Sequence, residues 1–299
     1  MTILILGGDA DEHAIWMLAH LAHRGADVEL LDSRWFPGDV QMAFDPVART
    51  GLLRLPSGRQ LDWRQIRSVY WRNYNGCAPS DLPDAQQAEI AHNDSRSMFE
   101  TLLLELDARW VNGSNAFRLH QTKPVQLARV AALGVAIPAT CLGNDAESVR
   151  SFVALHGDCV FKPVQGGAYT QKATPDMLGD EALARLAVAP VTIQEKISGD
   201  DIRVFVAGDR VLACQIETDA LDFRDDPQAK ITACKLPPEI HEQSMAIAST
   251  LELNWTGIDF RRTLEGRYVF FEANPSPMFI GFEQRTGLPL TESLATVLL

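Results

Sequence analysis

The sequence lacks the features that mark several common protein classes. Its five cysteines are odd in number and form no CxxC pair, so neither a disulfide framework nor a zinc site is indicated, and we expect a reducing cytoplasm as its location. No apolar run reaches the about 18 residues that a membrane-spanning helix needs, so we expect no membrane partner. The opening MTILILGGDADEH has no basic stretch and turns acidic at once, unlike a signal peptide. The net charge of −12 argues against nucleic-acid binding, which depends on neutralising phosphates.

What the sequence does contain is typical of a globular enzyme with alternating strands and helices. It has 299 residues, of which 46% are hydrophobic and 22% charged. Residues 1–114 predict a βα domain, with strands at TILIL, VELLD and 68–71 and a long helical stretch over 82–109. The GGDADE turn after the first strand is not GxGxxG, so no dinucleotide fingerprint is present.

Two further sections follow the N-terminal domain, and the fold class predicted for the whole chain is α/β (α+β). Residues 115–190 predict a smaller α/β unit with helices near 122–133 and 145–156. Residues 191–299 predict a third section whose strands lie at 191–196, 202–207, 210–217, 256–262 and 267–273.

A hairpin near the C-terminus gathers metal-ligand side chains. GIDFRR and RYVFFEAN flank TLEG, and counting from that turn puts Asp259 opposite Phe270, with Glu272 as its diagonal neighbour about 7–8 Å away between Cβ atoms. Strand alternation places Asn274 on the same face. Two carboxylates and an amide oxygen suit Mg²⁺, which completes its octahedron with water and phosphate oxygens. The alternative is that all three are polar caps of the hairpin.

Two lysines lie where phosphates could bind. Lys162, in CVFKPVQGG, leaves an apolar strand just before Gly166 and Gly167, whose backbone N–H groups could cover phosphates. Lys123 lies at a predicted helix start, which is a position that favours anions. The alternative for each lysine is a solvated surface residue.

Two charged segments each allow two interpretations. TIQEKISGDDIR carries Asp201 and Arg203 two residues apart, either as part of a binding site or as a surface ion pair. A basic stretch is opposed only by Asp62, and it is either a solvated surface or a docking surface for an acidic partner. Its arginines are Arg49, Arg54, Arg59, Arg64, Arg67 and Arg72.

In their order along the chain, Lys123, GVAIPAT, FKP with its glycine loop, IQEKISGDDIR and GIDF…FFEANPSP resemble the ATP-grasp superfamily. The resemblance implies an N-terminal pre-ATP-grasp domain and ATP held between two α+β subdomains. It also implies a carboxylate–amine (or related) ligation through an acylphosphate. The residues that it assigns are Lys123 and Lys162 on the phosphates, Gln194 with the backbone of Glu195 and Ile197 at the adenine edge, Asp201 on the ribose, and Asp259, Glu272 and Asn274 on magnesium.

A closer resemblance narrows the substrate. DIRVFV is similar to the ribosomal-protein glutamate ligases, while SVYWRNY, WVNGSN, LDFRDD and FEQRTGLPLTESLA look more like microviridin-type (graspetide) peptide ligases. That branch implies a ribosomal precursor peptide whose side-chain carboxylates are joined to hydroxyls or lysine amines. One departure concerns the acceptor chemistry, because NPSPMFIGFE has Ser276 and Pro277 where a glycine-containing tail is expected.

Three arginines complete the candidate site. Arg203 is the candidate catalytic cation, because a guanidinium stays charged and directional while the tetrahedral intermediate collapses. Arg72 and Arg224 lie in segments shared with the graspetide ligases, and we expect them to contact an acidic core peptide.

Three functions remain open from the sequence. The first is an ATP-dependent ligase that modifies a precursor peptide. The second is an ATP-grasp ligase that joins a small carboxylate and a small amine. The third is a nucleotide-binding partner protein without catalysis. A homodimer is one option for the assembly.

Overall fold

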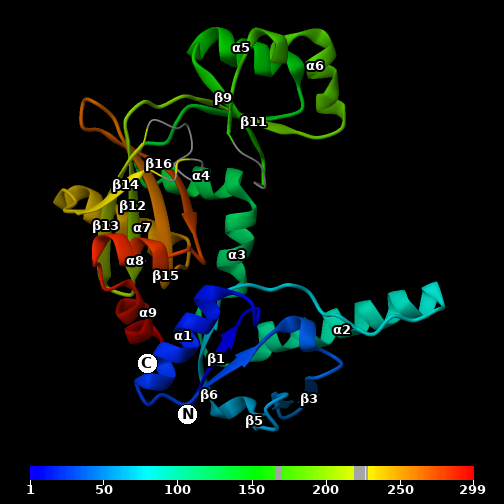
Figure 1. The fold of residues 1–299 in the computed structure, drawn as a ribbon. Coiled ribbons are helices and arrows are strands. Elements are labelled where there is room, and N and C mark those ends of the chain that lie inside the picture. The colour runs from blue at the N-terminus through cyan, green and yellow to red at the C-terminus, as the bar shows by residue number, and fades with distance from the viewer. Residues whose placement is uncertain (166–169, 219–225, 227) are drawn as a thin grey trace.

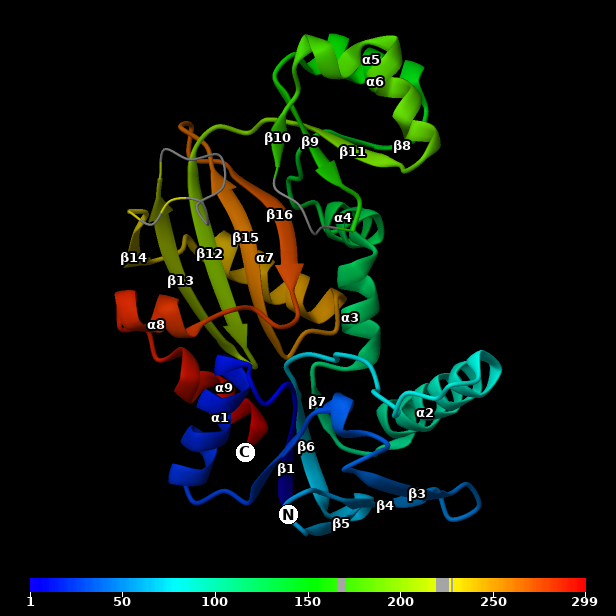
Figure 2. The same cartoon turned by 45° about the vertical axis from the view of Figure 1, so that its right-hand side comes forward.

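In the computed structural model, the described residues are 1–165, 170–218, 226 and 228–299. They form an N-terminal unit, a large antiparallel sheet in the middle and a small sheet with its own helices at the far end (Figures 1 and 2). Among the described residues, no helix is both long enough and apolar enough to cross a membrane.

The N-terminal unit is built on a parallel sheet in the order β2-β1-β6-β7. The all-apolar run TILIL forms β1 and is buried along its whole length, as expected of a parallel strand covered on both faces. A smaller antiparallel sheet, β3-β4-β5, packs beside it. The strands are β1 (Thr2–Leu6), β2 (Val28–Leu31), β3 (Gln41–Asp45), β4 (Thr50–Arg54), β5 (Gln60–Asp62), β6 (Ile66–Trp71) and β7 (Arg109–Val111).

Helices of the N-terminal unit begin at acidic caps. The side chain of Asp11 accepts a hydrogen bond from the backbone N–H of Ala14, and Asp84 does the same for Gln87. The long helix is therefore shorter than the stretch 82–109 predicted for it, and its N-terminal part extends away from the body (Figure 2). The helices are α1 (Glu12–His23), η1 (Ser33–Trp35), η2 (Trp63–Gln65) and α2 (Ala85–Glu105).

The small sheet has the order β10-β9-β11-β8. Strand β11 (Val191–Glu195) pairs with both β8 and β9. The strand expected at 191–196 therefore belongs to this second unit, whereas the predicted boundary at 190 put it in the third section. The elements here are β8 (Thr140–Gly143), α5 (Ala146–His156), β9 (Cys159–Pro163), β10 (Gln171–Lys172), η3 (Pro175–Leu178), α6 (Asp180–Ala184), η4 (Arg185–Ala187) and β11 (Val191–Glu195).

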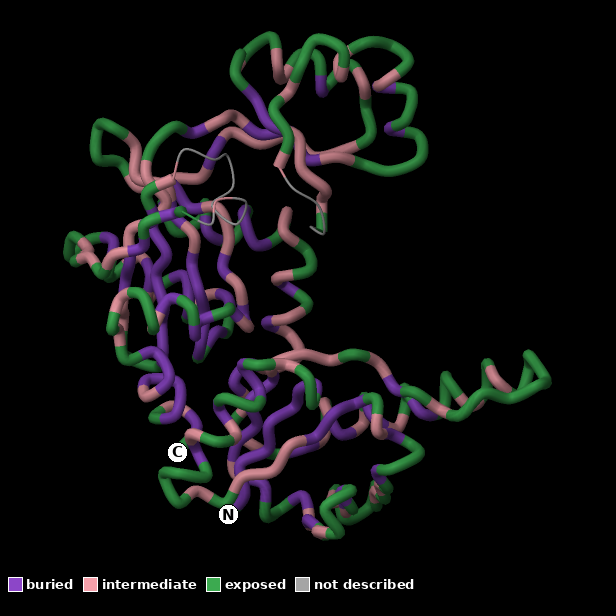
Figure 3. Tube along the Cα trace, in the orientation of Figure 1, coloured by how far each residue is buried: buried purple, intermediate pink, exposed green. Residues whose placement is uncertain are grey.

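The large sheet is antiparallel, in the order β14-β13-β12-β15-β16, and its strands are mostly buried (Figure 3). Helices that precede the small unit in the sequence and helices that follow it pack on this large sheet. Of these, α3 and α4 contact β16. The elements are α3 (Ser114–Gln121), α4 (Lys123–Ala131), β12 (Asp200–Ala207), β13 (Arg210–Glu217), β14 (Lys230–Cys234), α7 (Pro238–Thr250), β15 (Trp255–Arg262), β16 (Tyr268–Asn274), α8 (Ile280–Thr286) and α9 (Leu290–Leu298).

The C-terminal hairpin forms, but its register differs from the prediction. Asp259 lies directly opposite Glu272, and Phe260 lies opposite Phe270. Phe271 is therefore an extra residue on β16, which makes a β-bulge. Because of this extra residue, Asp259 and Glu272 are direct cross-strand neighbours and not diagonal ones. Their side chains still lie on the same face of the sheet.

The basic stretch of the N-terminal unit is largely neutralised within the protein. Arg59 donates two hydrogen bonds to Asp27, Arg64 pairs with Asp62, and Arg49 pairs with Glu105. These pairs favour the solvated-surface interpretation, and docking of an acidic partner stays a prediction.

The last helix joins the N-terminal unit to the large sheet. Leu294 and Leu298 of α9 are fully buried, in one apolar cluster with Ile3 of β1, Met17 of α1 and Phe205 of β12. Because this cluster draws on both units, the N-terminal unit and the large sheet share a core.

We predict that Leu294→Ala lowers the free energy of unfolding by about 2–5 kcal/mol, since it removes buried methyl groups and leaves a cavity in the shared core. Leu264→Ala is the control, because Leu264 is 90% exposed in the β15–β16 turn. Urea unfolding of both variants is the measurement. Equal stability of the two would mean that α9 is not part of the shared core.

Candidate functional site

Three neighbouring strands place a cation and two carboxylates in a row across the large sheet. Arg203 of β12 lies opposite Asp259 of β15, which in turn lies opposite Glu272 of β16. The Nη2 atom of Arg203 donates to Oδ2 of Asp259 at 3.2 Å, and its guanidinium lies over the ring of Phe282 at 5.4 Å. The arginine is 9% exposed, so its orientation is set by packing.

Gly257 gives the arginine its space. A Cβ atom at this position would lie 2.8 Å from Nη1 of Arg203 and 2.8 Å from Cβ of Pro277. Real Cβ atoms do not approach other atoms that closely, and a side chain here would displace the guanidinium. The glycine on β15 is therefore part of the construction of the site.

The two carboxylates differ in their electrostatic surroundings. Burial raises the pKa of Asp259 to about 7 against the opposing charge of Arg203, and the carboxylates of Glu272 and Asp201 add to the rise. Burial acts in the same direction on Glu272, but the Lys123 ammonium outweighs it and holds the pKa of Glu272 below its usual range. The site thus holds carboxylates that repel one another, and an additional positive charge would stabilise their ionised forms.

These side chains fit a hard divalent cation. Asn274 lies opposite Gly257 on β16, and its Oδ1 accepts a hydrogen bond from the Ser276 backbone at 2.9 Å, which orients the amide. Within the described ranges, no three His, Cys, Asp or Glu side chains come together as a metal site. A magnesium ion here would take its oxygen ligands from Asp259, Glu272 and Asn274, with phosphate and water completing the shell.

Both predicted phosphate lysines point toward this region, from different elements. Lys123, the first residue of α4, donates to Oε2 of Glu272. Lys162 on β9 donates to Oε1 of Gln194 at 2.9 Å, and its ammonium lies 4.9 Å from the ring centroid of Phe271. In the structure each lysine therefore has an acceptor on the protein.

The predicted adenine and ribose residues lie between the end of β11, which carries Gln194 and Glu195, and the start of β12, which carries Asp201. The backbone N–H of Glu195 donates to Ala139 at 3.0 Å, and its side chain accepts from the Ala139 N–H at 2.8 Å. Arg261 donates to the Ile197 carbonyl at 3.1 Å and to Asp201 at 2.8 Å. Asp201 is thus held by an arginine on β15.

Arg261 and Phe271, which lie in this region, were not singled out from the sequence. Arg261 and Phe271 come together, with the guanidinium 5.6 Å from the ring centroid of Phe271. Arg261 lies two residues after Asp259 on the same strand and hence on the same face, which is a signal that the sequence did contain. The β-bulge that positions Phe271 here has no such signal in the sequence.

Arg72 does not join this cluster. The Arg72 guanidinium donates to both carboxylate oxygens of Asp11, at 3.0 and 3.1 Å, and to the Ser276 carbonyl at 2.6 Å. It therefore ties the N-terminal unit to the loop after Asn274. The candidates Gly166, Gly167 and Arg224 lie outside the described residues.

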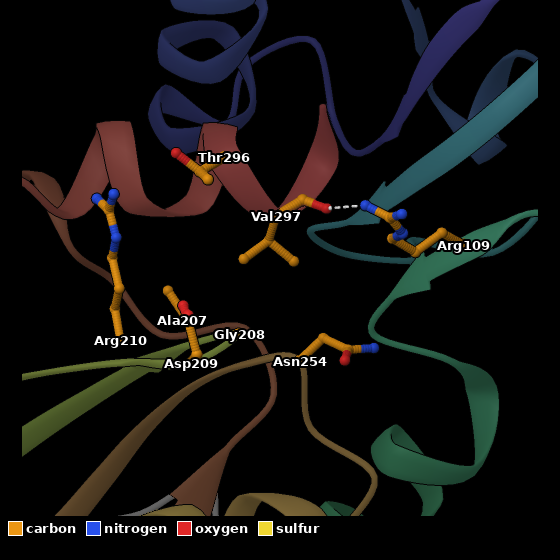
Figure 4. Close-up of a pocket in the computed structure, with 8 residues that line it drawn as sticks. All are labelled: Arg109, Ala207, Gly208, Asp209, Arg210, Asn254, Thr296 and Val297. Carbon is orange, nitrogen blue, oxygen red and sulfur yellow. Dashed lines mark hydrogen bonds between the residues drawn. The ribbon is translucent and has the colours of Figure 1, made fainter.

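A separate small cavity of about 260 Å³ lies where the N-terminal unit meets the large sheet (Figure 4). Arg109 of β7 points toward the end of α9 and donates to the Val297 carbonyl at 2.9 Å. The cavity also involves the β12–β13 turn, at the end of β12 remote from Asp201. It contains none of the candidate site residues.

The fold and the row of Arg203, Asp259 and Glu272 beside the small sheet define an ATP-grasp protein. Residues 181–298 match the family described as the RimK-like ATP-grasp domain. The structure of the ATP-grasp ligase PsnB with a phosphomimetic variant of its minimal precursor, Mg and ADP is 31% identical, with a TM-score of 0.85 over 99% of this chain and 97% of PsnB. The chain belongs to the ATP-grasp ligase family.

Two other relatives show how far the likeness extends. The probable alpha-L-glutamate ligase 2 of Shewanella denitrificans is 30% identical over 200 residues, which are 62% of this chain and 65% of that protein. The match therefore spans less than two thirds of this curated relative. The macrocyclase MdnC of Microcystis aeruginosa, bound with its precursor peptide MdnA, is 22% identical with a TM-score of 0.87 over 100% of this chain and 99% of MdnC, a likeness of fold.

Proposed function

We propose that this chain is an ATP- and Mg²⁺-dependent ligase that joins side-chain carboxylates of a ribosomal precursor peptide to amines or hydroxyls. The observation that carries the proposal is the alignment of Arg203, Asp259 and Glu272 across three strands, with Lys123 on the outer carboxylate. The likeness to PsnB over 99% of this chain supports the peptide substrate, because that structure holds a phosphomimetic variant of the minimal precursor together with Mg and ADP.

The reaction proceeds in two transfers. A substrate carboxylate oxygen attacks the γ-phosphorus of ATP, and ADP leaves, which gives an acylphosphate. The amine or hydroxyl then attacks the acyl carbon, loses its proton and expels inorganic phosphate. Mg²⁺, when bound, neutralises phosphate charge.

The protein contributes mostly positioning and electrostatics to this reaction. Lys123 and Lys162 bind the phosphates, and each exchanges a protein acceptor for a phosphate oxygen when ATP enters. Arg203 stays charged beside the reacting carboxyl and stabilises the tetrahedral oxyanion. Gln194, Glu195, Ile197 and Asp201 line the nucleoside side.

We propose that the peptide is acidic and that Arg203 and Arg224 contact its carboxylates. Arg72 is also proposed as a contact, beside its hydrogen bonds to Asp11 and Ser276. A cytoplasmic location accords with five free cysteines. The likeness to alpha-L-glutamate ligases favours a second candidate, the ligation of a free amino acid to a carboxylate.

The function is tested by mass spectrometry of a peptide. The probe is a synthetic peptide rich in Asp and Glu that also carries Lys, Ser and Thr side chains, incubated with enzyme, ATP and Mg²⁺. We expect loss of one water per cross-link together with release of phosphate. Unchanged peptide mass, with phosphate released when glutamate is added instead, would favour the second candidate.

Glu272→Gln is predicted to abolish turnover while the protein stays folded, because the amide is isosteric but removes the negative charge that would bind the metal. Glu265→Gln, in the exposed β15–β16 turn, is the matched control and keeps full activity. Phosphate release and thermal unfolding are measured for both. Wild-type turnover in Glu272→Gln would remove this residue from the metal site.

Lys123→Ala and Lys162→Ala are each predicted to weaken ATP binding by about 1–3 kcal/mol, since charge-assisted hydrogen bonds to phosphate are lost. Lys172→Ala is the control, because Lys172 lies on the same small sheet as Lys162 but pairs with Asp158 at 3.5 Å. Calorimetric titration with ATP gives the affinities. The assignment fails if both lysine variants bind ATP like the control.

A further inference from the structure

Strand β16, which carries Glu272 and Asn274, is the edge of the large sheet. Its outer side therefore has no neighbouring strand to accept and donate backbone hydrogen bonds. Helices α3 and α4 run beside this edge (Figure 2). What holds the edge decides where the two candidate metal ligands point.

Gln126 takes the place of the missing strand. Its Nε2 donates to the carbonyl of Ala273 at 2.9 Å, and its Oε1 accepts from the N–H of Ala273 at 2.9 Å. Ala273 lies between Glu272 and Asn274, so this one amide fixes the backbone on which both ligands are carried. Gln126 is 2% exposed, and water does not compete for these bonds.

Other contacts complete the same edge. The N–H of Phe270 donates to the carbonyl of Ala136 at 2.8 Å, and Nδ1 of His120 lies 3.2 Å from the Ala273 carbonyl oxygen. Beyond the strand, Nδ2 of the buried Asn112 donates to the Pro275 carbonyl at 2.7 Å. Among these contacts, only those of Gln126 engage both the N–H and the carbonyl of the same residue, Ala273.

The same turn of α4 also carries a phosphate lysine. Lys123 and Gln126 are three residues apart on the helix, which puts their side chains on one face. Lys123 reaches Glu272 from this face while Gln126 holds Ala273. The position of the lysine relative to the metal ligands is thus set by the Gln126 amide.

We propose that Gln126 is a positioning residue of the metal site, which fixes Glu272 and Asn274 relative to one another and to Lys123. This inference rests on the proposed function, because it takes Glu272 and Asn274 as metal ligands. Groups that orient metal ligands typically change metal affinity or activity by about 10- to 100-fold when removed. Gln126 acts through the backbone and need not touch the metal.

The test is Mn²⁺ affinity in the presence of ADP, measured by electron paramagnetic resonance on the full chain, with thermal unfolding measured in parallel. Gln126→Met keeps the length of the side chain and removes both hydrogen bonds. We expect its Mn²⁺ dissociation constant to rise about tenfold or more. If this variant does not fold, Gln126→Glu replaces it, because it keeps the acceptor for the Ala273 N–H.

The control is Ile247→Val on α7, a fully buried residue in the apolar cluster that α4 also enters. It lowers the unfolding temperature without touching β16 hydrogen bonds, and its Mn²⁺ affinity should equal that of the wild type. A Gln126 variant that loses thermal stability but keeps wild-type Mn²⁺ affinity overturns the inference and leaves the proposed function intact. Absence of Mn²⁺·ADP binding by the wild type overturns both.

Discussion

Two carboxylates lie directly opposite each other on neighbouring strands, and the surrounding structure has to balance their repulsion. Asp259 and Glu272 are cross-strand neighbours, and like charges in that arrangement destabilise a sheet. Each is offset by one cation from the other side, Arg203 on β12 for Asp259 and Lys123 on α4 for Glu272. The charge balance therefore ties together three strands and a helix. Under the proposed function, a divalent cation held by both carboxylates would take over part of this compensation and leave Lys123 available to a phosphate.

The N-terminal unit also bears on this site, although it contributes no candidate metal ligand. Arg72 bonds both Asp11 and the loop that follows Asn274, through the Ser276 carbonyl. Asn112, just after β7, donates to the carbonyl of Trp255, the first residue of β15, and to that of Pro275, which follows β16. Since α9 shares its core with β1 and β12, the N-terminal unit and the large sheet behave as a single support for the hairpin.

The sequence predicted those parts of the fold that depend on local pattern. The strand expected at 210–217 matches β13, and Asp259 and Glu272 were singled out as candidates because carboxylates within apolar strands are conspicuous. The register was wrong because the bulge at Phe271 lies in the continuous run VFFEA, where neither alternation nor a glycine marks an extra residue. The sheet of β11 could not be predicted, since pairing partners far apart in sequence leave no local signal. For the same reason Gln126 remained an ordinary helix residue until its contact with Ala273, 147 positions away, was observed.

The position of the cations also bears on how an acidic substrate would approach. A protein with a net charge of −12 repels such a substrate unless the field near the site is positive. Arg49, Arg59 and Arg64 are each paired with carboxylates, so the basic stretch contributes little field of its own. Near the site, Lys162 donates to the side-chain amide of Gln194, and its ammonium lies 4.9 Å from the ring centroid of Phe271. Under the proposed function, Lys123, Lys162 and Arg203 are the cations that ATP and the reacting carboxylate meet at the site. Because bound ATP would engage both lysines, further contacts must hold the peptide, and Arg224 is one of the proposed contacts.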